Sequence, residues 1–181
     1  MDVSLDATLA HLSLSGGEAL LDVGCGTGEL LRRLPAQSPP LRLAGVDLSA
    51  AMLAVARTKL PDDVCLLRAA ADVLPLAPAS YDVVTLTSAL HHLPRPAAAL
   101  AEIRRVLKPA GCLVLTDWCG DFFFYPLLAA WLRLTRRPIE RIFRSDECCA
   151  LLGKAGFRIM SVERFSINWR WRLMTIAAER N

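Results

Sequence analysis

The residues best suited to chemistry in this chain are three glycines and an aspartate. Residues 20–31 read LLDVGCGTGELL, so that a short apolar run contains Asp22 and is followed by Gly24, Gly26 and Gly28. Glycines let a tight turn bend and let the backbone approach a ligand closely. A helix that begins there presents its free N–H groups to that ligand. The segment predicts a strand, a turn and a helix, either with a nucleotide-type ligand or with a purely structural role.

The glycine spacing decides between two ligand classes. A dinucleotide fingerprint, G-x-G-x-x-G, needs glycine at position 29, where the chain has Glu29. The observed pattern, (Asp/Glu)-x-G-x-G-x-G, resembles motif I of the class I methyltransferases that depend on S-adenosylmethionine (SAM). The resemblance implies that the turn holds the zwitterionic methionine tail of SAM, with Asp22 suited to the tail's ammonium group.

Polar residues also follow later apolar runs. Asp47 and Asp72 come after the second and third runs, and His91 and His92 come after the fourth. Histidine titrates near neutral pH and suits proton transfer. The resemblance implies that the second of these histidines faces the ligand pocket, so His92 is the predicted general base, and a packing or capping role for it is the alternative.

The elements that must position these residues follow an alternating pattern. Short apolar runs alternate with helical patterns, which predicts an α/β fold with a parallel sheet. The predicted strands are 19–23, 41–46, 64–68, 81–87, 112–116, 157–164 and 169–178, and the predicted helices are 27–34, 50–59, 96–107 and 145–155. A short turn joins the last two strands, so the final strand is expected to run antiparallel.

Composition limits the class of protein. A length of 181 residues fits a single domain, residues 1–181, and 54% apolar residues suit a sheet covered on both faces. The net charge of +3 gives no strong field for nucleic acid. Six cysteines form no C-x-x-C pair, which predicts reduced thiols in a cytoplasmic protein and no metal site. The N-terminus lacks the features of a secretory signal, and the longest apolar run is shorter than the roughly 20 residues of a membrane helix.

Four ordered blocks extend the resemblance over nearly the whole chain. LLDVGCGTG is followed by GVDLSAAML at 45–53, ADVLPLAPASYDVVTLTSALHHL at 71–93 and EIRRVLKPAGCLVLTDW at 102–118. Together these resemble class I SAM-dependent methyltransferases of the ubiquinone/menaquinone-biosynthesis type. The resemblance implies a single doubly wound, Rossmann-like domain with strand order 3-2-1-4-5-7-6 and an antiparallel last strand.

The resemblance also implies the roles of the cofactor-binding residues. Asp47 would bind the ribose diol, Leu48 and Met52 would pack on adenine, and Asp72 with the backbone of Val73 would hydrogen-bond it. Thr87 would lie near the methionyl part. The implied set is Asp22, Gly24, Cys25, Gly26, Gly28, Asp47, Leu48, Met52, Asp72, Val73 and Thr87. For Asp47 and Asp72, a helix-start charge and a solvated loop aspartate remain the alternatives.

The resemblance implies methyl transfer by in-line displacement to a small, hydrophobic acceptor. A non-catalytic SAM-binding interaction module is the alternative. Residues 118–144, aromatic and then basic, are the expected substrate or cap segment, with peripheral membrane contact, a homodimer interface and plain core left open. No nucleic-acid partner is expected. The chain departs from the family at Ala110, where glycine is usual, and in the short segment before the first strand.

Binding of SAM and S-adenosylhomocysteine is the direct test of the resemblance. Ligand at about 100 times Kd stabilises a protein by about 2.7 kcal/mol. For a chain of this length, we expect the melting temperature to rise by roughly 5–10 °C in a thermal-shift assay. A shift with NADH and none with SAM would contradict the resemblance.

Overall fold

A computed structural model of the chain describes residues 3–34, 40–121, 141–167 and 172–181. The elements in chain order are α1 (Val3–Ala10), β1 (Ala19–Val23), α2 (Glu29–Arg33), β2 (Arg42–Asp47), α3 (Ala50–Lys59), β3 (Cys65–Arg68), β4 (Tyr81–Thr87), the 3-10 helix η1 (Leu90–His92), α4 (Pro96–Val106), β5 (Leu107–Trp118), α6 (Ser145–Lys154), β6 (Phe157–Ser166) and β7 (Arg172–Arg180).

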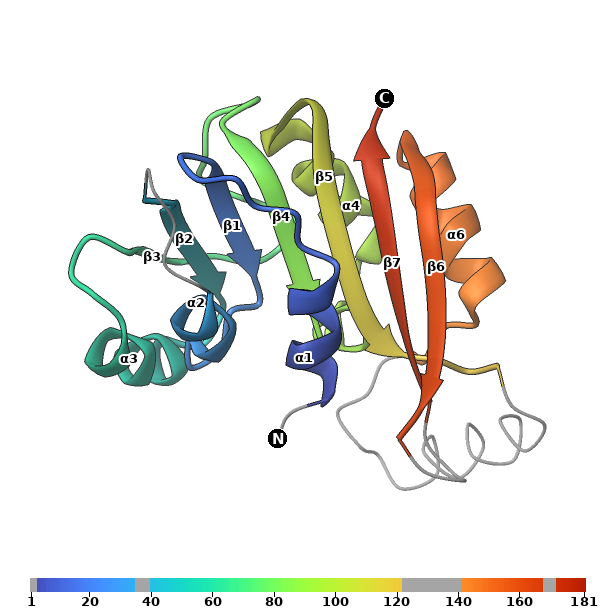
Figure 1. The fold of residues 1–181 in the computed structure, drawn as a ribbon, viewed down its shortest axis with the longest axis horizontal. Coiled ribbons are helices and arrows are strands. Elements are labelled where there is room, and N and C mark those ends of the chain that lie inside the picture. The colour runs from blue at the N-terminus through green and yellow to red at the C-terminus, as the bar shows by residue number, and fades with distance from the viewer. Residues whose placement is uncertain (1–2, 35–39, 122–140, 168–171) are drawn as a thin grey trace.

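The seven strands form one sheet in the order β3-β2-β1-β4-β5-β7-β6 (Figure 1). β7 pairs antiparallel with both β5 and β6, whereas β1, β2, β3, β4 and β5 pair in parallel. The predicted order and the antiparallel last strand are confirmed. The parallel strands end at one edge of the sheet, and this carboxyl edge is where such folds bind ligands.

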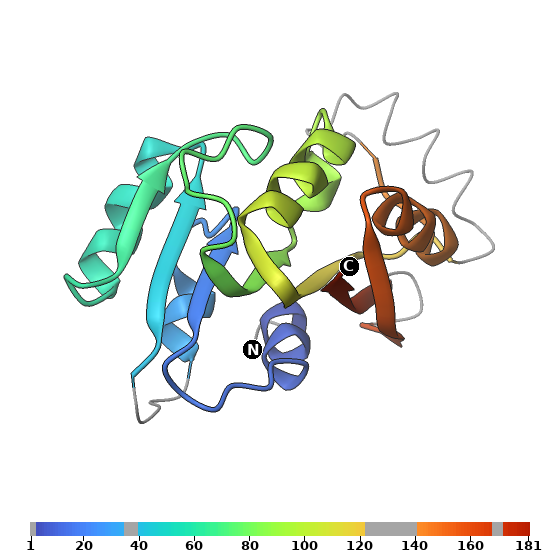
Figure 2. The ribbon, with the colours of Figure 1, turned by 90° about the horizontal axis from the view of Figure 1, so that it is seen from above.

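Both faces of the sheet carry helices. α1 lies on one face, over β4 and β5, while α4 and α6 lie on the other (Figures 1 and 2). Ala99, Leu100, Ile103 and Val106 form the buried stripe of α4, at the spacing of an amphipathic helix. All five residues of β1 are buried, as expected for a central strand covered on both sides. No described helix has the length and hydropathy needed to cross a membrane.

The predicted elements are confirmed with three corrections. The helix predicted at 27–34 begins only at Glu29, because Gly28 still has a left-handed φ of 74° and belongs to the turn. The strand predicted at 112–116 begins at Leu107, which pairs with Tyr81 before the register shifts. Helix α1 was not predicted, because its apolar and polar residues show no helical periodicity. Residues 169–171 of the last predicted strand lie outside the described residues. Smaller differences are confined to the ends of the other elements.

Ala110 lies inside this irregular start of β5. Its φ is 58°, a conformation that favours glycine, the residue usual at this position in the family. Alanine therefore occupies a backbone conformation to which glycine is better suited.

Asp22 is the charged residue at the centre of the sheet. It is 3% exposed, and its Oδ1 accepts a hydrogen bond of 2.8 Å from the Thr85 hydroxyl. Burial raises the pKa of Asp22 to about 7; the charge of Asp47 adds to the rise, and the Thr85 hydrogen bond opposes it. The core of β1 therefore holds a carboxyl group that resists ionisation.

Replacing Asp22 with asparagine should stabilise the free protein at high pH. Below the ordinary pKa of 3.8, the carboxyl is neutral in both folded and unfolded states. As pH rises from there to about 7, only the unfolded chain ionises, so the wild type loses stability on the order of 4 kcal/mol at 1.36 kcal/mol per pKa unit. Urea unfolding at pH 4, 6 and 8 should show the stability of Asp22→Asn, relative to wild type, increasing with pH.

Thr85→Val is the matched control. It removes the hydrogen bond that favours the ionised form, so its relative stability should decrease as pH rises. A difference between Asp22→Asn and wild type that stays constant from pH 4 to 8 would contradict this account.

Candidate functional site

The glycine turn is fixed to the neighbouring strand by backbone hydrogen bonds. The N–H groups of Gly24 and Cys25 both donate to the carbonyl of Val46, at 2.7 and 3.0 Å. A Cβ on Gly24 would lie 2.8 Å from Cβ of Ala89, whereas a Cβ on Gly26 would meet nothing within 4 Å. Gly24 thus allows close packing, and Gly26 leaves open space beside the backbone, as a closely bound ligand requires.

Asp47 joins the turn to the helix that follows β2. Its Oδ2 accepts the N–H of Gly26 at 2.8 Å, and its Oδ1 accepts the N–H of Ser49 at 2.8 Å. Ser49 in turn caps α3 by accepting the N–H of Met52. Each carboxylate oxygen has a second lone pair, so Asp47 can still accept two hydrogen bonds from a diol.

A cavity of about 570 Å³, the donor cavity, opens at the carboxyl edge of the sheet. Six of the predicted cofactor residues line it: Gly24, Gly26, Asp47, Leu48, Met52 and Asp72. Leu48 is 65% exposed and Met52 46%, so the cavity offers apolar surface that a flat ring could cover. The combination of open glycine backbone, a fixed carboxylate and uncovered apolar side chains fits a nucleoside with a polar tail.

The other predicted residues lie behind or beside this cavity. Asp22 and Cys25 are buried, and Gly28 faces Leu60. Burial raises the pKa of the Cys25 thiol to about 12, and the charges of Asp22 and Asp47 add to the rise, so this cysteine is no nucleophile. A Cβ on Gly45 would lie 2.8 Å from Sγ of Cys25, so the two residues occupy one tightly filled space.

Two further predicted residues have other surroundings. Val73 is 64% exposed. Thr87 lies 2.9 Å, oxygen to oxygen, from the Thr8 hydroxyl of α1. Thr8 also contacts Thr116 at 2.8 Å, and Thr116 contacts Thr175 at 3.0 Å. This buried hydroxyl cluster of four threonines attaches α1 to the sheet.

Asp72 has a partner on the opposite wall of the donor cavity. Its Oδ2 lies 2.6 Å from Nε of Arg95, which precedes α4 and is 70% exposed. This ion pair engages the carboxylate that is predicted to bind adenine. An exposed arginine is easily displaced, since exposed ion pairs contribute little.

A second cavity, of about 580 Å³, adjoins the first. Its lining residues come from both ends and from the middle of the chain: Val3, Ser4, Ser88, His91, His92, Trp118, Ile167 and Leu173. Ser88 and His92 line both cavities. Ser88 has a left-handed φ of 52°, a strained conformation of the kind found at functional sites.

The two histidines have different surroundings. His91 is buried, and its Nδ1 lies 2.6 Å from Oδ1 of Asp117 in β5. His92 packs on His91 with ring centroids 3.9 Å apart. The predicted base, His92, is thus at the junction of the cavities, while its neighbour is the one paired with a carboxylate.

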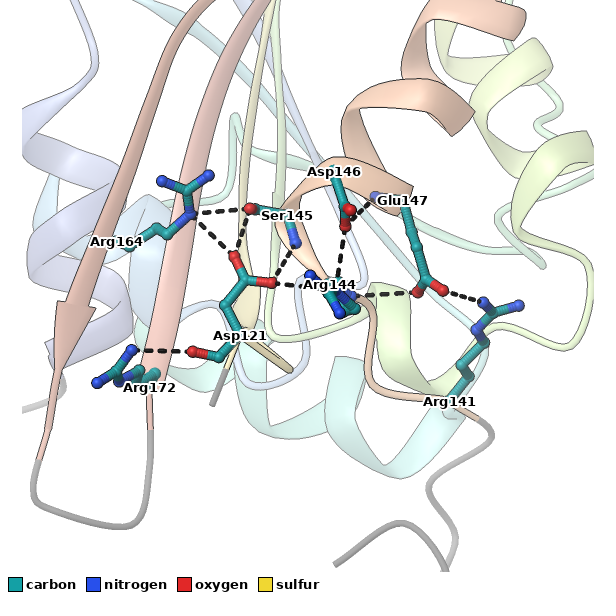
Figure 3. Close-up of polar contacts among 8 residues, drawn as sticks. All are labelled: Asp121, Arg141, Arg144, Ser145, Asp146, Glu147, Arg164 and Arg172. Atoms are coloured by element: carbon teal, nitrogen blue, oxygen red, sulfur yellow. Dashed lines mark hydrogen bonds and ion pairs between the residues drawn. The ribbon is translucent and has the colours of Figure 1, made fainter. Parts of the chain in front are cut away.

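Residues 122–140, most of the predicted substrate segment, lie outside the described residues, but both flanks are fixed by ionic contacts (Figure 3). Asp121 accepts hydrogen bonds from Ser145, through N–H and hydroxyl, and from Arg164 at 2.9 Å. Partial burial alone would raise the pKa of Asp121, but the Ser145 and Arg164 contacts outweigh it and lower the pKa. Arg141 pairs with Glu147 on the other flank.

Sequence reasoning missed Asp117, Ser88 and Arg95. Asp117 ends the fifth predicted strand next to the fourth, and carboxyl ends of adjacent parallel strands meet at one edge. That signal could have paired Asp117 with the histidines. The backbone conformation of Ser88 and the ion pair of Arg95 have no comparable signal in a single sequence.

Comparison with known proteins agrees with this geometry. The model of the methyltransferase domain matches residues 21–115, which are 95 of the 181 residues. Malonyl-(acyl-carrier protein) O-methyltransferase of Hahella chejuensis is 40% identical over 162 residues, 87% of this chain and 57% of that protein. Demethylmenaquinone methyltransferase of Chlamydia pneumoniae is 39% identical over 133 residues, 73% of this chain and 58% of that protein. The chain therefore spans little more than half the length of these relatives.

Solved structures show the same fold over almost the full chain. A protein of Bacillus halodurans C-125 superimposes with a TM-score of 0.85 at 19% identity, covering 99% of both chains. A SAM-dependent methyltransferase from Mesorhizobium loti gives 0.79 at 24% identity, covering 97% and 96%. Because the family model covers more than half of the sequence, the chain belongs to the methyltransferase-domain family.

Proposed function

We propose that this enzyme transfers the methyl group of SAM to a small, largely apolar molecule by in-line displacement. The observation that carries the proposal is the contact between the two cavities at Ser88 and His92. Bound SAM supplies a methyl group made electrophilic by a sulfonium. The chain's task is to hold the attacking atom, the methyl carbon and the sulfur in one line, and such positioning can contribute about 7–11 kcal/mol.

The donor cavity would hold SAM through the predicted residues. Asp47 would accept hydrogen bonds from the two ribose hydroxyls. The N–H groups of Gly26 and Ser49 already hold its two oxygens in place, and each oxygen keeps a free lone pair. Leu48 and Met52 would cover the adenine ring, and Asp72 would exchange Arg95 for the adenine amino group. The turn from Gly24 to Gly28 would carry the methionine tail, with the buried Asp22 acting on its ammonium group through space.

The second cavity would hold the acceptor. Trp118, Ile167, Leu173 and Val3 give it apolar walls, and the serines and histidines give it hydrogen-bonding groups near the junction. Relatives act on such different molecules as a carrier-bound malonyl group and demethylmenaquinone, so their names do not fix this acceptor.

Transfer of tritium tests the reaction. The protein is incubated with [methyl-³H]SAM and an ethyl-acetate extract of cells that contain the protein. After a second extraction with ethyl acetate, we expect the label in the organic phase. Label in protein or nucleic acid instead would contradict a small acceptor. Binding of S-adenosylhomocysteine without any transfer would favour the non-catalytic module.

Two tryptophan substitutions separate the cavities. Val3→Trp should fill the second cavity and lower transfer at least about tenfold, which corresponds to 1.4 kcal/mol, while the Kd of S-adenosylhomocysteine stays within about twofold. Ala70→Trp, in the wall of the donor cavity, should raise that Kd at least about tenfold. If Val3→Trp weakens cofactor binding as strongly as Ala70→Trp, the two cavities are not separate sites. Calorimetry and initial rates measure both effects.

A further inference from the structure

The second cavity contains a buried acid–imidazole pair. The side chains of His91 and Asp117 are 6% and 2% exposed, and Nδ1 lies 2.6 Å from Oδ1. The backbone N–H of His91 donates to Oδ2 at 3.2 Å, and that of Trp118 donates to Oδ1 at 2.6 Å. These contacts hold both the carboxylate and the ring in one orientation.

Burying this carboxylate costs free energy of folding unless contacts with other groups compensate for the lost water. An isolated carboxylate loses several kcal/mol when it leaves water. Within residues 3–34, 40–121, 141–167 and 172–181, Asp117 has no ion pair with lysine or arginine. His91 is therefore the side chain that this carboxylate contacts and orients.

One of the two ring nitrogens of His91 does not contact Asp117. Nδ1 faces Asp117, so Nε2 is the atom available to a molecule in the cavity that His91 lines. An imidazole whose Nδ1–H is held by a carboxylate presents Nε2 as a proton acceptor.

The rest of the lining limits the charge of the acceptor. Its described residues include hydroxyls, imidazoles, an indole and aliphatic groups, and no lysine, arginine, aspartate or glutamate. Among these described lining residues there is no cation to pair with an anionic acceptor. A neutral molecule with a polar hydrogen near the junction fits both the walls and Nε2.

We infer that the acceptor group is a hydroxyl on a neutral, largely apolar molecule, and that His91 takes its proton while Asp117 positions and stabilises the ring. The inference rests on the proposed function. The hydroxyl oxygen forms a bond to the methyl carbon, the carbon–sulfur bond breaks with its electron pair on sulfur, and the hydroxyl proton passes to Nε2 of His91. The products are a methyl ether, S-adenosylhomocysteine and a proton that His91 releases to water. This step replaces His92 with His91 as the base.

Four naphthalene probes with one apolar body test the acceptor group. 1-Naphthol, 1-naphthylamine, 1-naphthalenethiol and 1-naphthoic acid are each incubated with the protein and [methyl-³H]SAM. We expect methylation of the naphthol at oxygen and little or none of the others. Preferred methylation of the amine, the thiol, the acid or a ring carbon overturns the inference, and so does transfer to none of the four by protein that binds SAM. Absence of S-adenosylhomocysteine binding would instead remove the proposed function itself.

Variants test the proton transfer. His91→Asn and Asp117→Asn should each lower kcat for 1-naphthol roughly 10²–10⁴-fold, the usual contribution of general acid–base catalysis, with the Kd of S-adenosylhomocysteine within about threefold. His11→Gln, a histidine outside both cavities, should keep full activity. Full kcat in His91→Asn would overturn the assignment.

Acceptor acidity separates a base from a structural residue. Across ring-substituted 1-naphthols of decreasing pKa, the loss caused by His91→Asn should shrink, because a more acidic hydroxyl needs less help to lose its proton. A loss that stays constant across the series shows a structural role. If the variants do not fold, kcat of the unaltered protein is measured across the same ring-substituted 1-naphthols. A kcat that rises steeply as the naphthol becomes more acidic would show that no base assists and would overturn the assignment.

Discussion

The site depends on the convergence of two backbone N–H groups, from Gly24 and Cys25, on the single carbonyl of Val46. This contact fixes the end of β1 against the end of β2 and sets the path of the turn. Asp47, one residue beyond that carbonyl, then reaches back to the N–H of Gly26. The donor cavity is thus built from backbone geometry, and side chains contribute mainly at its rim.

Buried polar groups mark the parts of the core that serve function. Asp22 lies in the interior strand β1 and Asp117 near the end of β5, and each has a hydrogen-bonding partner. A buried carboxyl group costs free energy even when it is hydrogen-bonded, whereas an apolar residue would not. The four-threonine hydroxyl cluster adds a third polar region at the same edge, where it carries α1. α1 brings Val3 and Ser4 to the second cavity, so polar contacts in the core determine one wall of that cavity.

The sequence predicted the fold almost completely, because alternating apolar runs and glycine turns report on local geometry. The six predicted residues that line the donor cavity came from the family resemblance of the sequence motifs. The second cavity was less accessible to such reasoning. It combines α1, the loop after β4 and the last two strands, which are distant in sequence, and α1 lacks a helical pattern of apolar residues. His91 rather than His92 pairs with Asp117 because both histidines lie in a 3-10 helix, which directs their side chains differently. Two adjacent histidines in a sequence do not show which of them will face the carboxylate.

The shared space of Cys25 and Gly45 has a consequence for how this sequence can diverge. A side chain on Gly45 would collide with the thiol of Cys25, and Leu66 lies 3.0 Å from the same point on the other side. A residue larger than glycine at position 45 would therefore require both Cys25 and Leu66 to move, so the glycine turn and strands β2 and β3 constrain one another through a single point.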